Sequence, residues 1–333
     1  MPTQSLRRTP PRRPWILAAL AAVLAAATLA PNAKAIDLAL RLPVDLPAHL
    51  AKGQRVVPPE SGTWVGTYEE HSGSQIVKQN RLFDMEELIG RKVDVDHNYT
   101  AWNEPFPGWR EKWDIAHGRV PFVSWAKTST SAVNSGRYDR MIRQRAAEVK
   151  QFGHPILLEW FWEMDGRRNR HIAKSPAQFI AAWKRIHRIF DRAGVENVSW
   201  VWCPNAWGFH TGEAQKYYPG DEYVDWICAN GYNWAPGRDG DHWRSFEWIF
   251  QDFYDWAAGR GKPLMIGEFG VQERKPGEKA EWIREAAQTL KTKFTEIKAV
   301  VYFNVKKRYD WRLDTNSARG AWKYLAKEVR PDQ

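Results

Sequence analysis

Short apolar segments alternate with amphipathic segments along most of this chain, from about residue 61 to its end. The apolar segments are rich in β-branched and aromatic residues and have the length of strands. We expect eight strands, at residues 63–68, 93–99, 120–125, 155–162, 198–203, 224–232, 263–269 and 299–305. Segments with helical periodicity fall between them, and the clearest are 140–152, 176–194 and 278–294.

Strands that are apolar at nearly every position and are separated by helices are typical of a parallel sheet covered by helices. Eight such units within about 270 residues predict an α/β fold of the (β/α)8 (TIM) barrel type, with one catalytic domain over residues 61–330. An open, doubly wound sheet is the alternative. The sequence favours the barrel, since no glycine-rich dinucleotide loop follows the first predicted strand.

The first 60 residues do not follow this pattern. Residues 1–35 combine four arginines, the apolar run WILAALAAVLAAATLA and a small-residue site at Ala33–Ala35, which is the arrangement of a cleaved signal peptide. We therefore expect a secreted or periplasmic protein, with an uncleaved membrane anchor as the alternative. Residues 36–60 are interrupted by four prolines, which indicates a linker or an N-terminal arm.

Charge and cysteine content bear on several classes of protein. The net charge is +10, of which the predicted signal peptide contributes five basic residues and no acidic one, so we expect no nucleic-acid partner. Cys203 and Cys228 lie in apolar segments, where we expect buried thiols, with one disulfide as the alternative.

The nine histidines show no metal-binding spacing, so we expect neither a metal nor another cofactor. The 20 tryptophans exceed the usual share and fit a protein that stacks sugar rings on indoles.

In a (β/α)8 barrel the active site lies at the carboxyl ends of the strands, so polar residues there are candidates for chemistry. Glu163 and Glu268 end the fourth and seventh predicted strands, which lie across the barrel mouth from each other. Two carboxyl groups that face each other across a cleft are the equipment of glycoside hydrolysis, in which one protonates the leaving oxygen and the other attacks the anomeric carbon or activates water. Glu159 lies on the same face of its strand as Glu163, and we expect it deeper in the barrel, bound to a basic neighbour.

Four segments in order resemble the signature segments of glycoside hydrolase family 26, the β-mannanase type of retaining barrel: FWEMDG (161–166), YYPGDEYVDWICANGYNW (217–234), KPLMIGEFG (262–270) and VVYFNVKKRYDWRLD (300–314). The resemblance implies that Glu163 is the general acid/base and Glu268 the nucleophile. It also implies that Tyr232 donates a hydrogen bond to the nucleophile, that Trp311 is a platform for the sugar at the cleaved bond, and that Arg312 contacts that sugar.

The chain departs from the family's usual pattern beside the acid/base. Family members usually carry His before this glutamate and Asn two residues after it, whereas this chain has Trp162 and Asp165. The family's histidine at the end of the third strand is also absent, and Ser124, Trp125 and Lys127 stand there instead. These positions shape the subsite next to the cleaved bond, so they bear on the choice of sugar rather than on the chemistry.

Other polar and aromatic residues at strand ends complete the candidate set. With Trp162 and Asp165, we assign to substrate binding Asn230, Trp202, Asn205 and Trp207. The ends of the first two strands supply further candidates for the donor side of the cleft, namely Glu69, Glu70, Asp96 and His97.

These features together predict a secreted, monomeric, endo-acting β-glycoside hydrolase that cleaves a β-linked polysaccharide and has no stable membrane insertion. β-1,4-Mannan is the first expectation, and mixed-linkage β-glucan and β-1,3-xylan are the alternatives within the family. The alternative from another class is a sugar-binding barrel without catalysis, or a partner in exopolysaccharide assembly.

Overall fold

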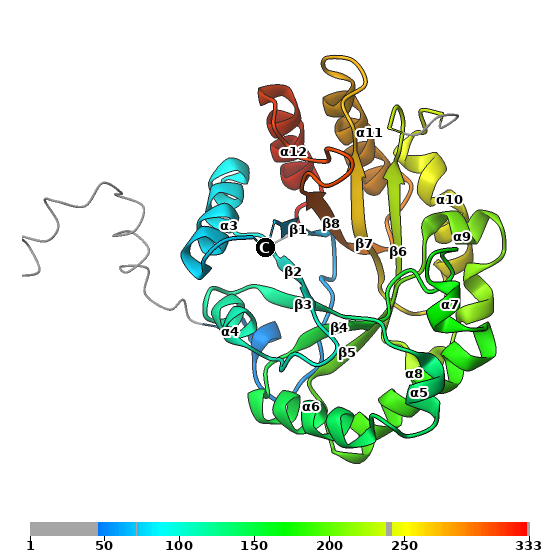
Figure 1. The fold of residues 1–333 in the computed structure, drawn as a ribbon. Helices are drawn as coiled ribbons and strands as arrows, with labels where there is room; N and C mark the ends of the chain where they lie inside the picture. Colours follow the sequence, from blue (N-terminus) through cyan, green and yellow to red (C-terminus); the bar gives the residue numbers. More distant parts are fainter. Residues whose placement is uncertain (1–45, 71, 238–241, 332–333) are drawn as a thin grey trace, which may run out of the picture. The chain divides into compact units, whose positions relative to one another are not determined.

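The computed structural model describes residues 46–331, except residue 71 and residues 238–241. The predicted signal peptide lies outside these residues. Eight parallel strands follow one another around a closed barrel in the order of the sequence, with helices outside them (Figure 1). The predicted (β/α)8 fold is therefore confirmed.

The strands lie close to the predicted segments. They are β1 (Trp64–Glu69), β2 (Val95–Thr100), β3 (Val120–Trp125), β4 (Ile156–Trp160), β5 (Val198–Trp202), β6 (Trp226–Asn233), β7 (Leu264–Val271) and β8 (Ile297–Asn304). The prediction for β4 ran two residues too far, because Phe161 has φ 62°, a left-handed conformation that ends the strand.

The main helices connect successive strands on the outside of the barrel. They are α3 (Gln75–Ile89), α4 (Trp109–Ala116), α5 (Thr130–Asn134), α6 (Asp139–Phe152), α7 (Arg170–Ala173), α8 (Pro176–Arg192), α9 (Ala206–His210), α10 (Phe246–Ala257), α11 (Glu278–Thr292) and α12 (Asn316–Glu328). Short 3₁₀ turns are η1 (Ala48–Leu50), η2 (Ala214–Tyr217) and η3 (Asp221–Tyr223). The signals that predicted α8 act as expected, since the Ser175 side chain caps it and Pro176 is its first residue.

Two apolar layers hold the barrel together. Alternate strand residues such as Phe122, Leu157 and Val201 form a cluster inside the barrel. Their neighbours in sequence, such as Leu158 and Trp202, belong to a larger cluster with the helices. This alternation decides which residues at the strand ends can reach the mouth.

Residues 46–60 pack against the inner cluster. Leu50 and Val56 are buried with the first residues of several strands, and the Val56 amide donates to the Ser199 hydroxyl at 2.9 Å. The carbonyl of Leu50 is 2.9 Å from Nδ1 of His154. This segment therefore covers the amino ends of the strands, on the side opposite the predicted active site.

Cys203 and Cys228 form a disulfide, so the expectation of buried thiols is wrong and the alternative holds. Cys203 directly follows β5 and Cys228 lies in the neighbouring strand β6, both on the inner face. The register that brings them together is a property of the paired strands and is not visible in the sequence of either one. In the described part of the chain, no helix is long and apolar enough to cross a membrane.

Candidate active site

Glu163 lies in a tight turn directly after β4. Its φ is 55°, and non-glycine residues in this left-handed region are uncommon and concentrate at functional sites. Its amide donates to the carbonyl of Cys203 at 2.9 Å, and its carbonyl accepts from Nδ2 of Asn169 at 2.8 Å. The end of β5 and the loop after β4 therefore hold the backbone of this glutamate from two sides.

Glu268 owes its orientation to an extra residue in β7. Ile266 pairs with Ala229 and Glu268 pairs with Asn230, so Gly267 has no partner and forms a bulge. Strict alternation from Met265, which points into the barrel, would turn Glu268 toward the helices. The extra residue restores an inward orientation for Glu268.

Only glycine fits at this bulge. A Cβ atom on Gly267 would lie 2.6 Å from Sγ of Cys228 and 3.0 Å from Sγ of Cys203. The disulfide thus packs directly beneath the bulge.

Two tyrosine hydroxyls donate to the Glu268 carboxylate. Tyr99, near the end of β2, donates to Oε1, and Tyr232, near the end of β6, donates to Oε2. Burial raises the pKa of Glu268, and these hydrogen bonds and the charges of Lys307 and Lys127 oppose that rise. Sequence analysis found Tyr232 but missed Tyr99, although the alternation of β2 places it on the inner face.

Glu163 holds its proton more strongly. Burial, followed by the charge of Glu268, raises the pKa of Glu163 to about 8, against the opposing effects of Lys127 and the Asn230 amide. Glu268 has two hydroxyl donors, which favour its charged form, and among the described residues no hydroxyl donates to Glu163, so the surroundings favour the proton on Glu163 and the charge on Glu268. This division between two carboxyl groups is the one that a proton donor and a nucleophile require.

Glu159 lies below this pair and makes no ion pair with any residue that the structure describes. It is 1 % exposed, and its carboxylate accepts from the Ser124 hydroxyl, which is 2.8 Å from Nε2 of the buried His97. Burial raises the pKa of Glu159 well above its usual value and lowers that of His97. The expected basic partner is therefore replaced by a neutral hydrogen-bonded chain across β2, β3 and β4.

Aromatic rings and two lysines line the mouth above these carboxyl groups. Trp162 is half-buried, with its ring centroid 4.8 Å from that of Tyr99, and Nζ of Lys127 lies 4.5 Å from the Trp162 centroid. A second group of rings around Tyr68 and Phe303 lies on the β1 and β8 side.

Trp311 and Arg312 do not lie as the resemblance implied. Trp311 is 3 % exposed and packs 4.8 Å from Tyr232, so it supports that tyrosine and presents almost no open ring face to a sugar. Arg312 makes a bidentate ion pair with Asp310, at 2.8 and 2.6 Å, which occupies its guanidinium.

Of the two tryptophans assigned to the end of β5, one is buried and the other is exposed. Trp202 is fully buried against Phe209, Tyr218 and Trp256 on the helix side, so its assignment to sugar contact is wrong. Trp207, on α9, is 60 % exposed.

Asp165 and Asn205 are bound to each other. Oδ1 of Asp165 accepts from the backbone and side-chain amides of Asn205, both at 3.0 Å, and Asp165 is 4 % exposed. This pair ties the loop after β4 to the start of α9 and leaves Asp165 closed to a substrate. Asn230 is also buried, between Glu163 and the disulfide.

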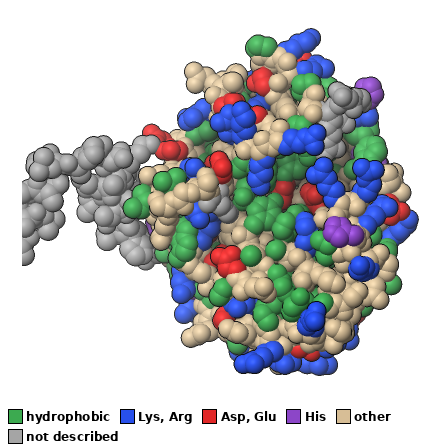
Figure 2. Space-filling view, in the orientation of Figure 1, with side chains coloured by type: hydrophobic (Ala, Val, Ile, Leu, Met, Phe, Trp, Pro, Cys, Tyr) green, Lys and Arg blue, Asp and Glu red, His purple; other side chains and the backbone are tan. Residues whose placement is uncertain are grey.

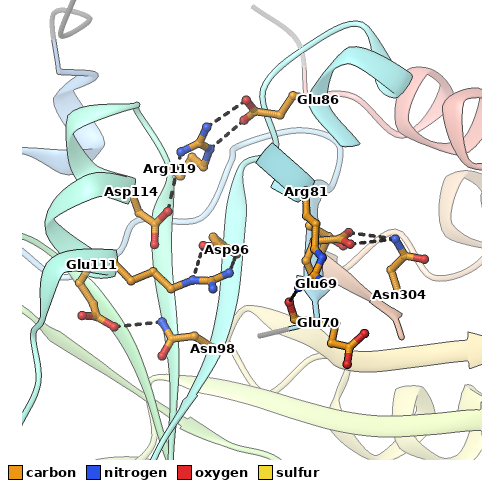
Figure 3. Close-up of polar contacts among 12 residues, drawn as sticks. Glu69, Glu70, Arg81, Glu86, Asp96, Asn98, Glu111, Asp114, Arg119 and Asn304 are labelled. Carbon is orange, nitrogen blue, oxygen red and sulfur yellow. Dashed lines mark hydrogen bonds and ion pairs between the residues drawn. The ribbon is translucent and has the colours of Figure 1, made fainter. Parts of the chain in front are cut away.

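The acidic candidates on β1 and β2 point away from the mouth. Asp96 makes a buried bidentate pair with Arg110 at 2.7 and 2.8 Å, and Glu69 accepts from Nδ2 of Asn304 (Figure 3). Glu70, which directly follows β1, is exposed. The expectation that Asp96 and Glu69 line the cleft is therefore wrong, whereas the buried His97 stacks on Phe122 inside the barrel. Among the described residues, no group of three or more His, Cys, Asp or Glu side chains is placed to hold a metal ion.

Comparison with known proteins gives one family match. The model of glycosyl hydrolase family 26 matches residues 124–254, from the end of β3 into α10. Endoglucanase H of Acetivibrio thermocellus is 31 % identical over 269 residues, which are 77 % of this chain and 29 % of that protein. A mannan endo-1,4-beta-mannosidase of Caldalkalibacillus mannanilyticus is 26 % identical over 172 residues, which are 51 % of this chain and 29 % of that protein.

The fold also matches solved structures. GH26C from Muricauda sp. MAR_2010_75 superposes with a TM-score of 0.61 at 13 % identity, over 82 % of this chain and 90 % of that one. At this identity the likeness concerns the fold alone. The chain spans less than a third of the length of the two relatives named above.

Proposed function

Because this barrel belongs to glycoside hydrolase family 26, we propose that it cleaves β-linked polysaccharides internally by double displacement, with Glu163 as acid/base and Glu268 as nucleophile. The observation that carries the proposal is the pair itself. Glu163 has a pKa raised to about 8, and Glu268 accepts hydrogen bonds from two tyrosine hydroxyls. We also propose that the chain is exported, on the pattern of residues 1–35.

The proposed first step uses both groups at once. Glu268 attacks the anomeric carbon while Glu163 gives its proton to the leaving oxygen, which yields a glycosyl ester and a shortened chain. Glu163, now ionised, takes a proton from the water that hydrolyses the ester, and Glu268 is regenerated. Tyr99 and Tyr232 hold the two oxygens of Glu268, so the attacking carboxylate is oriented before the substrate binds.

The direct test is the release of reducing ends from a panel of β-glycans by the purified protein. β-1,4-Mannan, expected from the motifs, and β-glucan, suggested by the name of the 31 % identical relative, are the first substrates to try, followed by β-1,3-xylan. Cleavage with a rapid fall in viscosity supports an endo-acting hydrolase. Binding to the glycans without any cleavage would favour the non-catalytic barrel instead.

Removing the Tyr99 hydroxyl tests how the nucleophile is held. In Tyr99→Phe the carboxylate loses a donor that favours its charged form, so the pKa of Glu268 rises. The acid limb of the kcat/KM profile, which reports ionisation of Glu268, is expected to move to higher pH by about one unit. Tyr324→Phe, on the outer helix α12, serves as the control and should leave the profile in place. An unmoved acid limb in Tyr99→Phe would contradict the assignment.

Replacing Trp207 tests whether a long substrate extends along the barrel mouth as far as α9. Its exposed ring lies 6.1 Å from that of Trp248, at an interplanar angle of 35°, and α9 follows β5 on the side where the strands end. Trp207→Ala is expected to raise KM for a long polymer by about 3- to 10-fold, the usual effect of one lost ring contact. Activity on a short aryl glycoside, which cannot reach this ring, should not change. An equal loss on both substrates would show that Trp207 acts through folding.

A further inference from the structure

Two lysines from different parts of the barrel, one after β3 and one after β8, lie near Glu268. Lys127 follows β3 and is half-buried, with Nζ 4.5 Å from the centroid of Trp162. Lys307 follows β8 and is exposed, with Nζ 5.2 Å from the centroid of Phe303 and 5.6 Å from that of Tyr68. Both are near enough to Glu268 to lower its pKa. Lys127 lies over Trp162 and Nζ of Lys307 lies 5.9 Å from the centroid of Tyr99, so both ammonium groups lie beside the aromatic pair in which Tyr99 contacts Glu268.

Neither ammonium group has an ion-pair partner among the residues that the structure describes. Two other basic side chains of the β8 loop are paired with Asp310: Lys306 is 3.6 Å and Arg312 is 2.6 Å from its carboxylate. Lys and Arg side chains are also spread over the face of the molecule seen in Figure 2, so a basic surface alone indicates nothing. Lys127 and Lys307 combine the lack of an ion-pair partner among the described residues with a position close enough to Glu268 to affect its pKa.

The carboxyl groups of the mouth do not balance these two charges. Burial raises the pKa of Glu159 well above its usual value and that of Glu163 to about 8, which favours the neutral form of both. In the proposed mechanism Glu268 carries the negative charge before the first step. When Glu268 forms the glycosyl ester, Glu163 has given up its proton and carries that charge instead, so at either stage the two ammonium groups face one catalytic carboxylate. An unpaired cation in a partly dehydrated cleft is costly, so a group supplied by the substrate would stabilise this state.

We propose that the subsite between Lys127 and Lys307 binds a sugar that carries a carboxylate, so that the preferred substrate is a β-linked polysaccharide containing uronic acid residues. Trp162 and Tyr99 offer ring surface for the apolar face of that sugar, and the two ammonium groups hold its carboxylate. The inference rests on the proposed function and narrows its substrate class. Trp162 and Lys127 stand where the motifs depart from the usual family pattern, which is where a change of sugar is expected to be encoded.

The test compares two polymers that differ in this charge alone: a neutral β-glucan, and the same β-glucan oxidised at C6 to the uronate. The wild-type protein is expected to show a kcat/KM at least about 10-fold higher on the oxidised polymer. In Lys127→Gln and Lys307→Gln the ratio of the two kcat/KM values should fall, and in the double variant it should approach one. High salt should reduce the wild-type ratio in the same direction. A merely structural role for the lysines would lower both rates together and leave the ratio unchanged.

Lys184→Gln is the matched control. Nζ of Lys184 also lies over an aromatic ring, 4.4 Å from the centroid of Tyr223, but on the outer helix α8. This variant should keep both the rates and the ratio.

The outcomes separate the two proposals. Equal cleavage of both polymers by the wild-type protein would overturn the uronate proposal and leave the glycoside hydrolase intact. If neither polymer is cleaved, the proposed function fails for β-glucan, and retardation of the wild-type protein in gels containing each polymer still decides the charge preference. Retardation by the oxidised polymer that is lost in the double variant supports the inference, and equal retardation by both polymers refutes it.

Discussion

Replacing Glu268 with alanine is expected to lower kcat/KM by about 10⁴-fold or more, because the covalent route loses its nucleophile. The loss should appear on every substrate, whatever its leaving group, since no other described carboxylate receives the two tyrosine hydroxyls. The measurement is the initial rate of reducing-end release, with circular dichroism to show that the barrel remains folded.

Chemical rescue distinguishes a lost nucleophile from a damaged site. A small external anion such as azide can enter the space that the carboxylate vacates and attack the anomeric carbon directly. With Glu268→Ala and an activated aryl glycoside, azide is expected to restore part of the rate and to give a glycosyl azide of inverted configuration. The control variant Glu281→Ala, on the exposed side of α11, should keep the wild-type rate without azide. Turnover close to that of the wild type in a folded Glu268→Ala protein would refute the assignment.

Replacing Glu163 with glutamine should give a different pattern. The amide cannot donate a proton to the leaving oxygen, so hydrolysis of the natural polymer is expected to fall by about 10²- to 10⁴-fold. The wild-type kcat/KM should decline as pH rises through about 8, because the acid with the raised pKa then loses its proton. That alkaline limb should be absent in Glu163→Gln. The measurement is the pH–rate profile of both proteins between pH 4 and 10 with one substrate.

The leaving group supplies the control for this variant. A dinitrophenyl glycoside needs little protonation, so its first step should be almost as fast in Glu163→Gln as in the wild type, and the glycosyl-enzyme should accumulate. Equal losses on the polymer and on the dinitrophenyl substrate would argue that Glu163 is not the proton donor.

The fold was predictable because its signals are local and repeated. Each strand is a short apolar run, each helix has its own periodicity, and α8 carries a serine cap and an N-terminal proline. Eight such units leave few ways to bury their apolar faces other than a closed barrel. Glu163 and Glu268 could be selected as candidates because each stands at the end of an apolar strand, which is visible in the sequence. The side chains around them depend on finer geometry.

Three of the misassigned residues share one cause, which is the side of the sheet that they face. Alternation turns Trp202, Glu69 and Asp96 toward the helices, and Asp96 also lies near the amino end of β2. Counting inward from Val201 or Val95 would have excluded Trp202 and Asp96 and would have pointed to Tyr99. The same counting would have failed for Glu268, because the bulge at Gly267 is set by pairing with β6.

That bulge has a consequence for anyone who wishes to move this active site to another eight-stranded barrel. Grafting the two glutamates and two tyrosines at equivalent strand ends would not suffice, because a regular seventh strand would turn the residue equivalent to Glu268 toward the helices. The graft must also carry the unpaired glycine and the disulfide that packs against it. A working graft of this barrel therefore has to include the backbone irregularity shared by β5, β6 and β7 as well as the proposed catalytic side chains.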